Sequence, residues 1–215
     1  SLLKFLAGTN KPIIVSTGAA TFQKISYAIK TLKKYGAKQI FLLQCTASYP
    51  APIISLNLSS IPALKEKFKI PVGFSDHSID PLVAPLLAIG YGATIIEKHF
   101  TLNRKFAGPD HAFAIEPKDL KKLVSSIRDA DAAKGTGIKT VEKTEKELER
   151  FATRSVQATT IIHKGDKLEF EKNFELLRPG KRSRGADAIF IHKINGKISR
   201  RKILTGDGIK INYVY

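Results

Sequence analysis

Four short apolar stretches, each running into polar residues and then into an amphipathic segment, organise the first part of the chain. Each stretch is rich in β-branched or aromatic residues and has the length of a strand that is covered on both faces. We predict strands at residues 13–18 (IIVSTG), 40–46 (IFLLQCT), 70–77 (IPVGFSDH) and 93–99 (ATIIEKH).

Apolar residues between these strands recur with the spacing of an α-helix. Thr21 and Asp80 are expected as N-caps, the latter followed by Pro81 at the first helical position, and Gly36 and Gly90 are expected near helix ends. The apolar positions of the other helical segments are Phe22, Ile25, Ile29 and Leu32; Ile61, Leu64 and Phe68; and, after Pro117, an inner face of Leu120, Leu123, Val124 and Ile127.

Strand and helix alternate through residues 1–135, which predicts an α/β fold with a parallel sheet. Four strand–helix units are half of an eight-unit barrel, which typically needs about 250 residues. The units therefore form either a small open sheet or a barrel whose front part is missing.

The pattern changes after this region. Residues 136–153 form a charged linker with helical character. Residues 154–215 are predicted to form a separate small β-rich domain, because short strand-like runs alternate with glycine turns (HKGDKL, INGKI, TGDGIKI).

Composition sets broad limits. The chain of 215 residues is 43% hydrophobic, which is typical of a globular protein with one mid-sized and one small domain. No apolar run approaches the roughly 18 to 20 residues that span a bilayer, and the start lacks the features of a signal peptide, so we expect a cytoplasmic protein with no membrane partner. The single cysteine, Cys45, fits a reducing compartment.

The formal net charge of +17 is spread along the chain. Its densest part runs from Arg178 to Lys202, with nine basic residues and one acid. Nucleic-acid binding would use such a patch, but the stretch shows no aromatic interleaving and no helix-turn-helix or zinc pattern. We expect a solvated surface that attracts small anionic substrates, and no nucleic-acid partner.

Polar residues gather where the predicted strands end, which is the edge where α/β folds bind ligands. Strand alternation places His77 and His99 on the same face of their strands. If the strands are neighbours, two imidazoles lie side by side and suit a divalent transition metal; the alternative is two unrelated histidines. Asp76 and Lys98 would then point towards the helices, in an exposed or salt-bridged structural role.

Several motifs resemble the sialic acid synthase family, which includes the N-acetylneuraminate, legionaminic and pseudaminic acid synthases and related spore-coat polysaccharide proteins. In chain order they are STGAAT, LLQCTASYPAP, NLSSIPAL, VGFSDHSID, GATIIEKHFTLNRKFAGPDHAFAIEP, RSVQATTIIHKGD and LLRPG. The resemblance covers nearly the whole chain. It implies the C-terminal half of a TIM (β/α)8 barrel at residues 1–135 and a SAF (antifreeze-like) domain at residues 154–215.

The resemblance also implies an enzyme, a transferase that condenses phosphoenolpyruvate with the open-chain aldehyde of an N-acetylated amino sugar. The products are a nine-carbon 2-keto acid of the sialic acid type and phosphate. His77 and His99 match the metal-binding histidines of the family. The metal, manganese with magnesium or cobalt as alternatives, would polarise the aldehyde carbonyl as a Lewis acid.

The resemblance extends to four substrate-binding positions. Ser16 and Ser75 match residues that hold phosphoenolpyruvate, although both could simply cap strand ends. Asp110 matches the aspartate that holds sugar hydroxyls and is a catalytic candidate; without the family it is a loop aspartate. Tyr49 is expected to line the sugar pocket, with a packed turn tyrosine as the alternative.

Two further residues are catalytic candidates. Glu97, one inward layer below His99, would orient a metal-bound water or ligand; otherwise it is a buried carboxylate paired with a neighbouring lysine. Arg178 is also a fifth substrate-binding candidate: it matches the SAF arginine that reaches the partner subunit's active site, where its guanidinium could fork onto a sugar hydroxyl or carboxylate. This implies a homodimer acting in trans; otherwise Arg178 is a surface cation.

The sequence departs from the family pattern at two places. The chain starts at what resembles the fifth barrel strand and contains no methionine, so we expect a fragment that is inactive or nearly so alone. Ala47 stands where members that use N-acetylmannosamine often carry Asn, which suggests a different sugar such as a 2,4-diacetamido-6-deoxy sugar. A non-catalytic fragment that binds sugar or dimerises is the rival interpretation.

Overall fold

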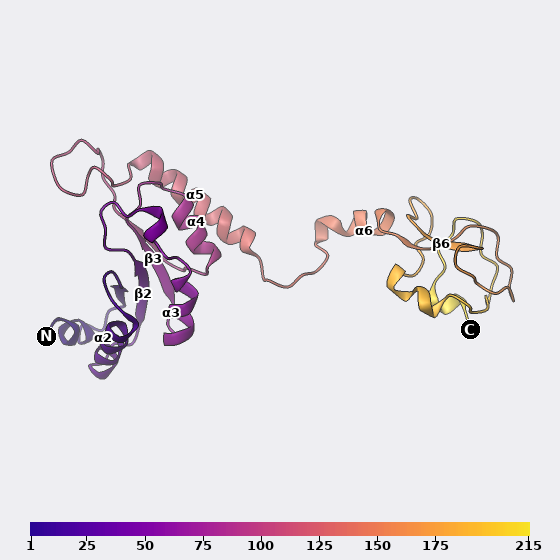
Figure 1. The fold of residues 1–215 in the computed structure, drawn as a ribbon, viewed down its shortest axis with the longest axis horizontal. Helices are drawn as coiled ribbons and strands as arrows, with labels where there is room; N and C mark the ends of the chain where they lie inside the picture. Colours follow the sequence, from indigo (N-terminus) through magenta and orange to yellow (C-terminus); the bar gives the residue numbers. More distant parts are fainter. The chain divides into compact units, whose positions relative to one another are not determined.

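The computed structural model describes residues 1–215 and divides them into two compact units, Ser1–Gly137 and Ile138–Tyr215 (Figure 1). No helix combines the length and the apolar character that crossing a membrane requires. The elements of the first unit are α1 (Leu2–Ala7), β1 (Ile13–Ser16), α2 (Phe22–Lys34), β2 (Ile40–Cys45), the 3-10 helix η1 (Ile53–Ser55), α3 (Ser60–Phe68), β3 (Val72–Asp76), α4 (Val83–Gly90), β4 (Ile96–Lys98) and α5 (Pro117–Lys134).

The four strands of the first unit form one parallel sheet in the order β1-β2-β3-β4. Strand order therefore follows chain order, without the reversal that marks a doubly wound sheet. Consecutive parallel strands that alternate with helices are the arrangement of a TIM barrel. The prediction of a parallel α/β fold is confirmed, and the four units have a TIM-barrel-like topology.

The helices cover one face of the sheet. Leu32 of α2 is fully buried in the same cluster as Leu42 of β2 and Phe74 of β3. On each strand these residues alternate with side chains that point to the opposite, inner face. The first unit thus has a continuous apolar layer on its helical side.

The inner face requires a glycine at one position. A Cβ atom at Gly73 would lie 2.4 Å from the backbone oxygen of Ile95 and 2.7 Å from Cδ2 of Leu43. Both distances are shorter than van der Waals contact. Any side chain at Gly73 would therefore push strands β3 and β4 apart, close to the edge of the sheet where polar residues follow the carboxyl ends of the strands. We call this edge the polar rim.

Helix boundaries follow the sequence signals with two differences. Thr21 caps α2 as predicted and accepts a hydrogen bond from the backbone nitrogen of Lys24. Helix α4 begins at Val83 with Leu82 at the N-cap position, so the predicted N-cap Asp80 and first helical residue Pro81 both lie before the helix. Asp80 nevertheless accepts hydrogen bonds from the backbone nitrogens of Leu82 and Val83. The short helix α1 was not anticipated from the sequence.

The prediction that Val124 belongs to the inner face of α5 is wrong. Leu123 is buried, whereas Val124 is 47% exposed. Ile127 packs against the core cluster on the same side as Leu123. The stripe therefore follows the i, i+4 spacing, and Val124 lies beside it on the solvent face.

The second unit has little regular strand. Strands β5 (Ser155–Ala158) and β6 (Phe174–Leu177) pair antiparallel, and isolated bridges such as Ile162 with Ile203 supply most of the remaining β pairing. Its other elements are the 3-10 helices η2 (Lys143–Glu145), η3 (Ala188–Lys193) and η4 (Ile211–Tyr213) and helix α6 (Lys146–Ala152). A separate buried cluster includes Val156, Phe174 and Ile209.

Candidate functional site

The carboxyl ends of β3 and β4 bring two polar residues of the inner face together. Ser75 and Glu97 are partners in the parallel register. The Ser75 hydroxyl donates to Oε1 of Glu97 at 2.7 Å. Because the Ser75 hydroxyl donates to Glu97, its oxygen keeps lone pairs that can accept from a ligand.

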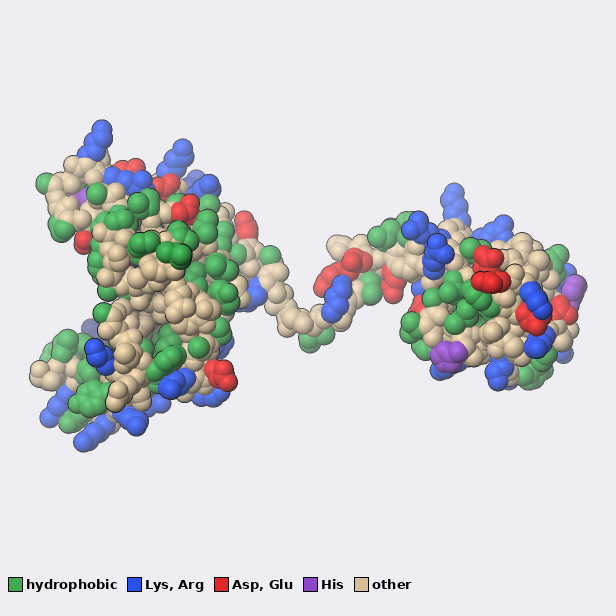
Figure 2. Space-filling view, in the orientation of Figure 1, with side chains coloured by type: hydrophobic (Ala, Val, Ile, Leu, Met, Phe, Trp, Pro, Cys, Tyr) green, Lys and Arg blue, Asp and Glu red, His purple; other side chains and the backbone are tan.

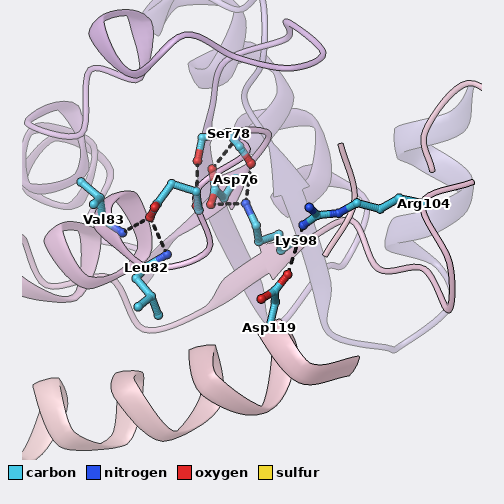
Figure 3. A network of polar contacts seen from close by, with 8 residues as sticks. Asp76, Ser78, Leu82, Val83, Lys98, Arg104 and Asp119 are labelled. Atoms are coloured by element: carbon cyan, nitrogen blue, oxygen red, sulfur yellow. Dashed lines mark hydrogen bonds and ion pairs between the residues drawn. The ribbon is translucent and has the colours of Figure 1, made fainter. Parts of the chain in front are cut away.

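The alternative in which Glu97 pairs with a neighbouring lysine is wrong. Lys98 points to the other face, where its Nζ lies 2.6 Å from Oδ2 of Asp76 (Figure 3). Both of those side chains are buried, so the salt-bridged role predicted for Asp76 and Lys98 is confirmed. Glu97 itself is exposed on the inner face.

His77 and His99 lie side by side just beyond these two residues. Their ring centroids are 5.1 Å apart and the rings are inclined by 70°. Nδ1 of His77 lies 2.8 Å from the backbone oxygen of Thr46. Since a carbonyl oxygen only accepts, Nδ1 carries the hydrogen, and in the neutral ring Nε2 carries a free lone pair.

Two aromatic rings pack around the histidines. The Tyr49 ring centroid is 4.2 Å from that of His77 and 5.8 Å from that of His99. Phe113 lies 5.0 Å from His99, again between ring centroids, and is buried. The rings of Tyr49 and Phe113 thus pack against the two imidazoles, while Tyr49 itself stays about half exposed.

The loop after β4 returns to the site. The backbone nitrogen of Ile115 donates to the His99 carbonyl at 2.9 Å, and that of Thr101 donates to the Ile115 carbonyl at 2.9 Å. These bonds bring the loop back beside the end of β4. Oδ2 of Asp110, on this loop, comes 3.8 Å from Nδ1 of His99. That distance is too long for a hydrogen bond and leaves the largely exposed carboxylate free for a ligand.

The structure does not bring every candidate together. Ser16 is exposed at the end of the edge strand β1, where it pairs with Leu43 of β2. It therefore lies on the same rim but at the far side of the sheet from β4. Arg178 belongs to the second unit and is exposed immediately after β6.

Cys45 lies at the same rim. Its Sγ is 3.9 Å from Nδ1 of His77. Burial raises the pKa of the Cys45 thiol, the nearby Glu97 carboxylate adds to the rise, and a hydrogen bond with Ser75 opposes it. Cys45 is therefore held as a neutral thiol rather than as a nucleophilic thiolate.

The donor set fits a metal held by two imidazoles. No group of three or more His, Cys, Asp or Glu side chains is arranged to hold an ion, so a metal between the adjacent rings of His77 and His99 would have only these two protein ligands. A carbonyl that orients one imidazole through Nδ1 is the outer-shell arrangement common in metal sites. The remaining coordination positions would fall to water and substrate oxygen.

Sequence reasoning missed two contributors. Thr46 acts through its backbone carbonyl, which no residue type can signal. Phe113 lies within a motif already noted for its resemblance, but only the return of the loop shows that it packs against His99. An aromatic residue between the Gly-Pro-Asp turn and the next helix was the available signal.

Fold and rim together define a TIM-barrel-like α/β protein whose ligand edge carries paired histidines. The model of the NeuB family matches residues 1–139, and the chain belongs to this family.

Named relatives agree with this assignment. The chain is 40% identical over 201 residues to the N,N'-diacetyllegionaminic acid synthase of Campylobacter jejuni, covering 93% of this chain and 59% of the relative. It is 35% identical over 211 residues to the pseudaminic acid synthase of the same species, covering 98% and 60%. These relatives are synthases of sialic-acid-type sugars.

A solved structure supports the same fold. The crystal structure of the spore coat polysaccharide biosynthesis protein SpsE from Bacillus subtilis matches 100% of this chain and 64% of that chain, with a TM-score of 0.59 and 36% identity. The chain thus spans roughly three fifths of the length of the relatives it matches.

Proposed function

We propose that this chain carries the metal-binding and sugar-binding side of a synthase that condenses phosphoenolpyruvate with the aldehyde of an N-acetylated amino sugar. The products would be a nine-carbon 2-keto acid and phosphate. Membership of the NeuB family supports the reaction class. The observation that carries the proposal is the pairing of His77 and His99 at the ends of adjacent strands.

His77 and His99 would hold the metal through neutral imidazoles. A bound divalent ion, in our proposal manganese, would supply Lewis-acid polarisation of the aldehyde carbonyl. The Thr46 carbonyl, by accepting the Nδ1 hydrogen, keeps His77 in the tautomer whose Nε2 can donate its lone pair. The rings of Tyr49 and Phe113, which pack against His77 and His99, would restrict rotation of the imidazoles.

The substrates would meet the chain at different parts of the rim. Asp110, exposed and close to His99, would accept hydrogen bonds from sugar hydroxyls, and the Tyr49 ring would flank the sugar. Ser16 and Ser75 would hold phosphoenolpyruvate. Glu97, hydrogen-bonded to Ser75, would orient a water molecule or a substrate hydroxyl on the inner face.

The second unit would act as a SAF domain in a homodimer. Under this proposal, Arg178 completes the site of the partner subunit, where its guanidinium would fork onto a sugar hydroxyl or carboxylate. The exposed place of Arg178 directly after β6 leaves its guanidinium free for such a contact.

Sugar binding tests the proposal directly. The manganese-loaded protein is titrated calorimetrically with N-acetylmannosamine and with a 2,4-diacetamido-6-deoxy sugar, the latter because the Ala47 side chain cannot hydrogen-bond a substrate. We expect the second sugar to bind more tightly, and Asp110→Ala to weaken binding about tenfold, since the sugar hydroxyl would lose its charged acceptor.

The matched control is Asp129→Ala, which removes an exposed carboxylate from α5. It should bind sugar as the unchanged protein does. Sugar affinity that is the same in the Asp110→Ala variant, or that does not depend on the metal, would contradict the proposed site.

A further inference from the structure

One buried ion pair lies directly behind the two histidines. Asp76 precedes His77 at the end of β3, and Lys98 precedes His99 at the end of β4. Their side chains point to the helix side of the sheet, with Nζ and Oδ2 2.6 Å apart and exposed fractions of 4% and 0%. The ion pair therefore ties the two strands together one residue before each histidine.

The same ion pair also holds the backbone beyond His77 (Figure 3). The backbone nitrogen of Ser78 donates to Oδ1 of Asp76 at 2.8 Å. Lys98 donates from Nζ to the backbone oxygen of Ser78 at 2.6 Å. His77 thus lies between Asp76 and Ser78, which both belong to this network. Lys98, the third member, directly precedes His99.

Net stability alone is a poor explanation for such a pair. The cost of taking two charges out of water cancels much of their attraction, and apolar residues of similar volume often stabilise a core as well or better. What a buried pair provides is a fixed distance and direction between its two charged groups, and so between the strands that carry them, because separating the charges would leave each of them uncompensated.

We infer that Asp76 and Lys98 are positioning residues, which set the distance and orientation of the His77 and His99 imidazoles from the opposite face of the sheet. This inference rests on the proposed metal site for its functional meaning. Its structural part stands on the contacts of Ser78 and the register of β3 with β4.

The test compares Asp76→Asn and Lys98→Met with the unchanged protein in two measurements. The first is the dissociation constant of Mn²⁺ alone, from the EPR signal of the free ion. The second is the tautomer of the His77 ring in the metal-free protein, from long-range ¹H–¹⁵N NMR correlations. We expect Mn²⁺ to bind about 10- to 100-fold more weakly, as is common when an outer-shell partner is removed. The Nδ1-protonated tautomer of His77 should give way to a mixture.

Asp119→Asn is the matched control, since it breaks the partly exposed ion pair with Arg104 in the same region without touching Ser78. It should leave both measurements unchanged. If the single variants lose their fold, the double variant Asp76→Leu/Lys98→Met removes both charges together and should fold while showing the same two losses. Native Mn²⁺ affinity and a native His77 tautomer in folded variants would overturn the inference.

The two proposals fail in different ways. If the unchanged protein binds no Mn²⁺, the metal site of the proposed function is wrong. The His77 tautomer then still decides the positioning role, because it is read without metal. A tautomer that is unchanged in every variant would refute that role.

Discussion

Asp80 shows how a single residue joins the polar rim to the helix layer. One of its carboxylate oxygens accepts from the backbone nitrogens of Leu82 at 2.8 Å and Val83 at 2.7 Å. These two backbone hydrogen bonds are the main cause that holds the pKa of Asp80 below its usual value. Asp80 thus pairs the backbone N–H groups at the start of α4 and joins them to the loop that follows His77.

We expect Asp80→Ala to lower the free energy of unfolding by about 1 kcal/mol at pH 7, the usual loss for a helix cap. Asp80→Asn keeps an acceptor oxygen and should lose less. Because the folded-state pKa is lowered, the charged cap stabilises above the unfolded-state pKa, and this contribution disappears as pH falls through the folded value. Urea unfolding at pH 7 and at acid pH measures the free energy of unfolding that each variant loses relative to the unchanged protein. The loss for Asp80→Ala should be smaller in acid. Equal losses for Asp80→Ala and Asp80→Asn at pH 7 would contradict the role of the Asp80 charge.

At this scale the sequence identified residue types better than their contacts. Strand alternation placed His77 and His99 on one face of their strands, but whether they meet depended on the two strands being neighbours, which only the sheet order and register show. Thr46 and Phe113 could not be found in that way. Their contacts depend on how loops fold back, and loop geometry is set by tertiary packing rather than by periodicity.

At the scale of elements, the sequence located all four strand–helix units of the first unit, but not the lengths of their strands. Strand β4 covers only Ile96–Lys98 of the predicted residues 93–99, and it pairs with one neighbour, β3. In the second unit, most predicted strands are single bridges. Strand length depends on which partners a segment finds, and local pattern does not contain that information.

Helix α5 offers a matched test of the packing. Leu123 is buried, and the adjacent Val124 is 47% exposed. We expect Leu123→Ala to cost about 2 to 5 kcal/mol of unfolding free energy through lost contacts and a cavity. Val124→Ala should stay within about 0.5 kcal/mol, as surface substitutions usually do. Denaturant unfolding of both variants decides; a larger loss for Val124→Ala would mean that the helix packs through the other face.

At the scale of the whole molecule, the chain consists of two compact units, Ser1–Gly137 and Ile138–Tyr215. Lysine and arginine side chains are scattered over both units (Figure 2), in keeping with the net charge of +17. Two separate buried clusters, one in each unit, stabilise the two folds. In the second unit, Arg200 and Arg201 lie over the rings of Tyr215 and Tyr213, at 4.5 and 4.7 Å from the ring centroids.

The central claim concerns His77 and His99, and manganese binding tests it most directly. Mn²⁺ is titrated into the protein and the free ion is followed by EPR, with His99→Ala as the site variant and His163→Ala, an exposed histidine of the second unit, as its control. We predict one saturable site that is lost in His99→Ala and kept in His163→Ala. Equal binding by all three proteins, or no binding by any, would contradict a metal site formed by the paired strand ends.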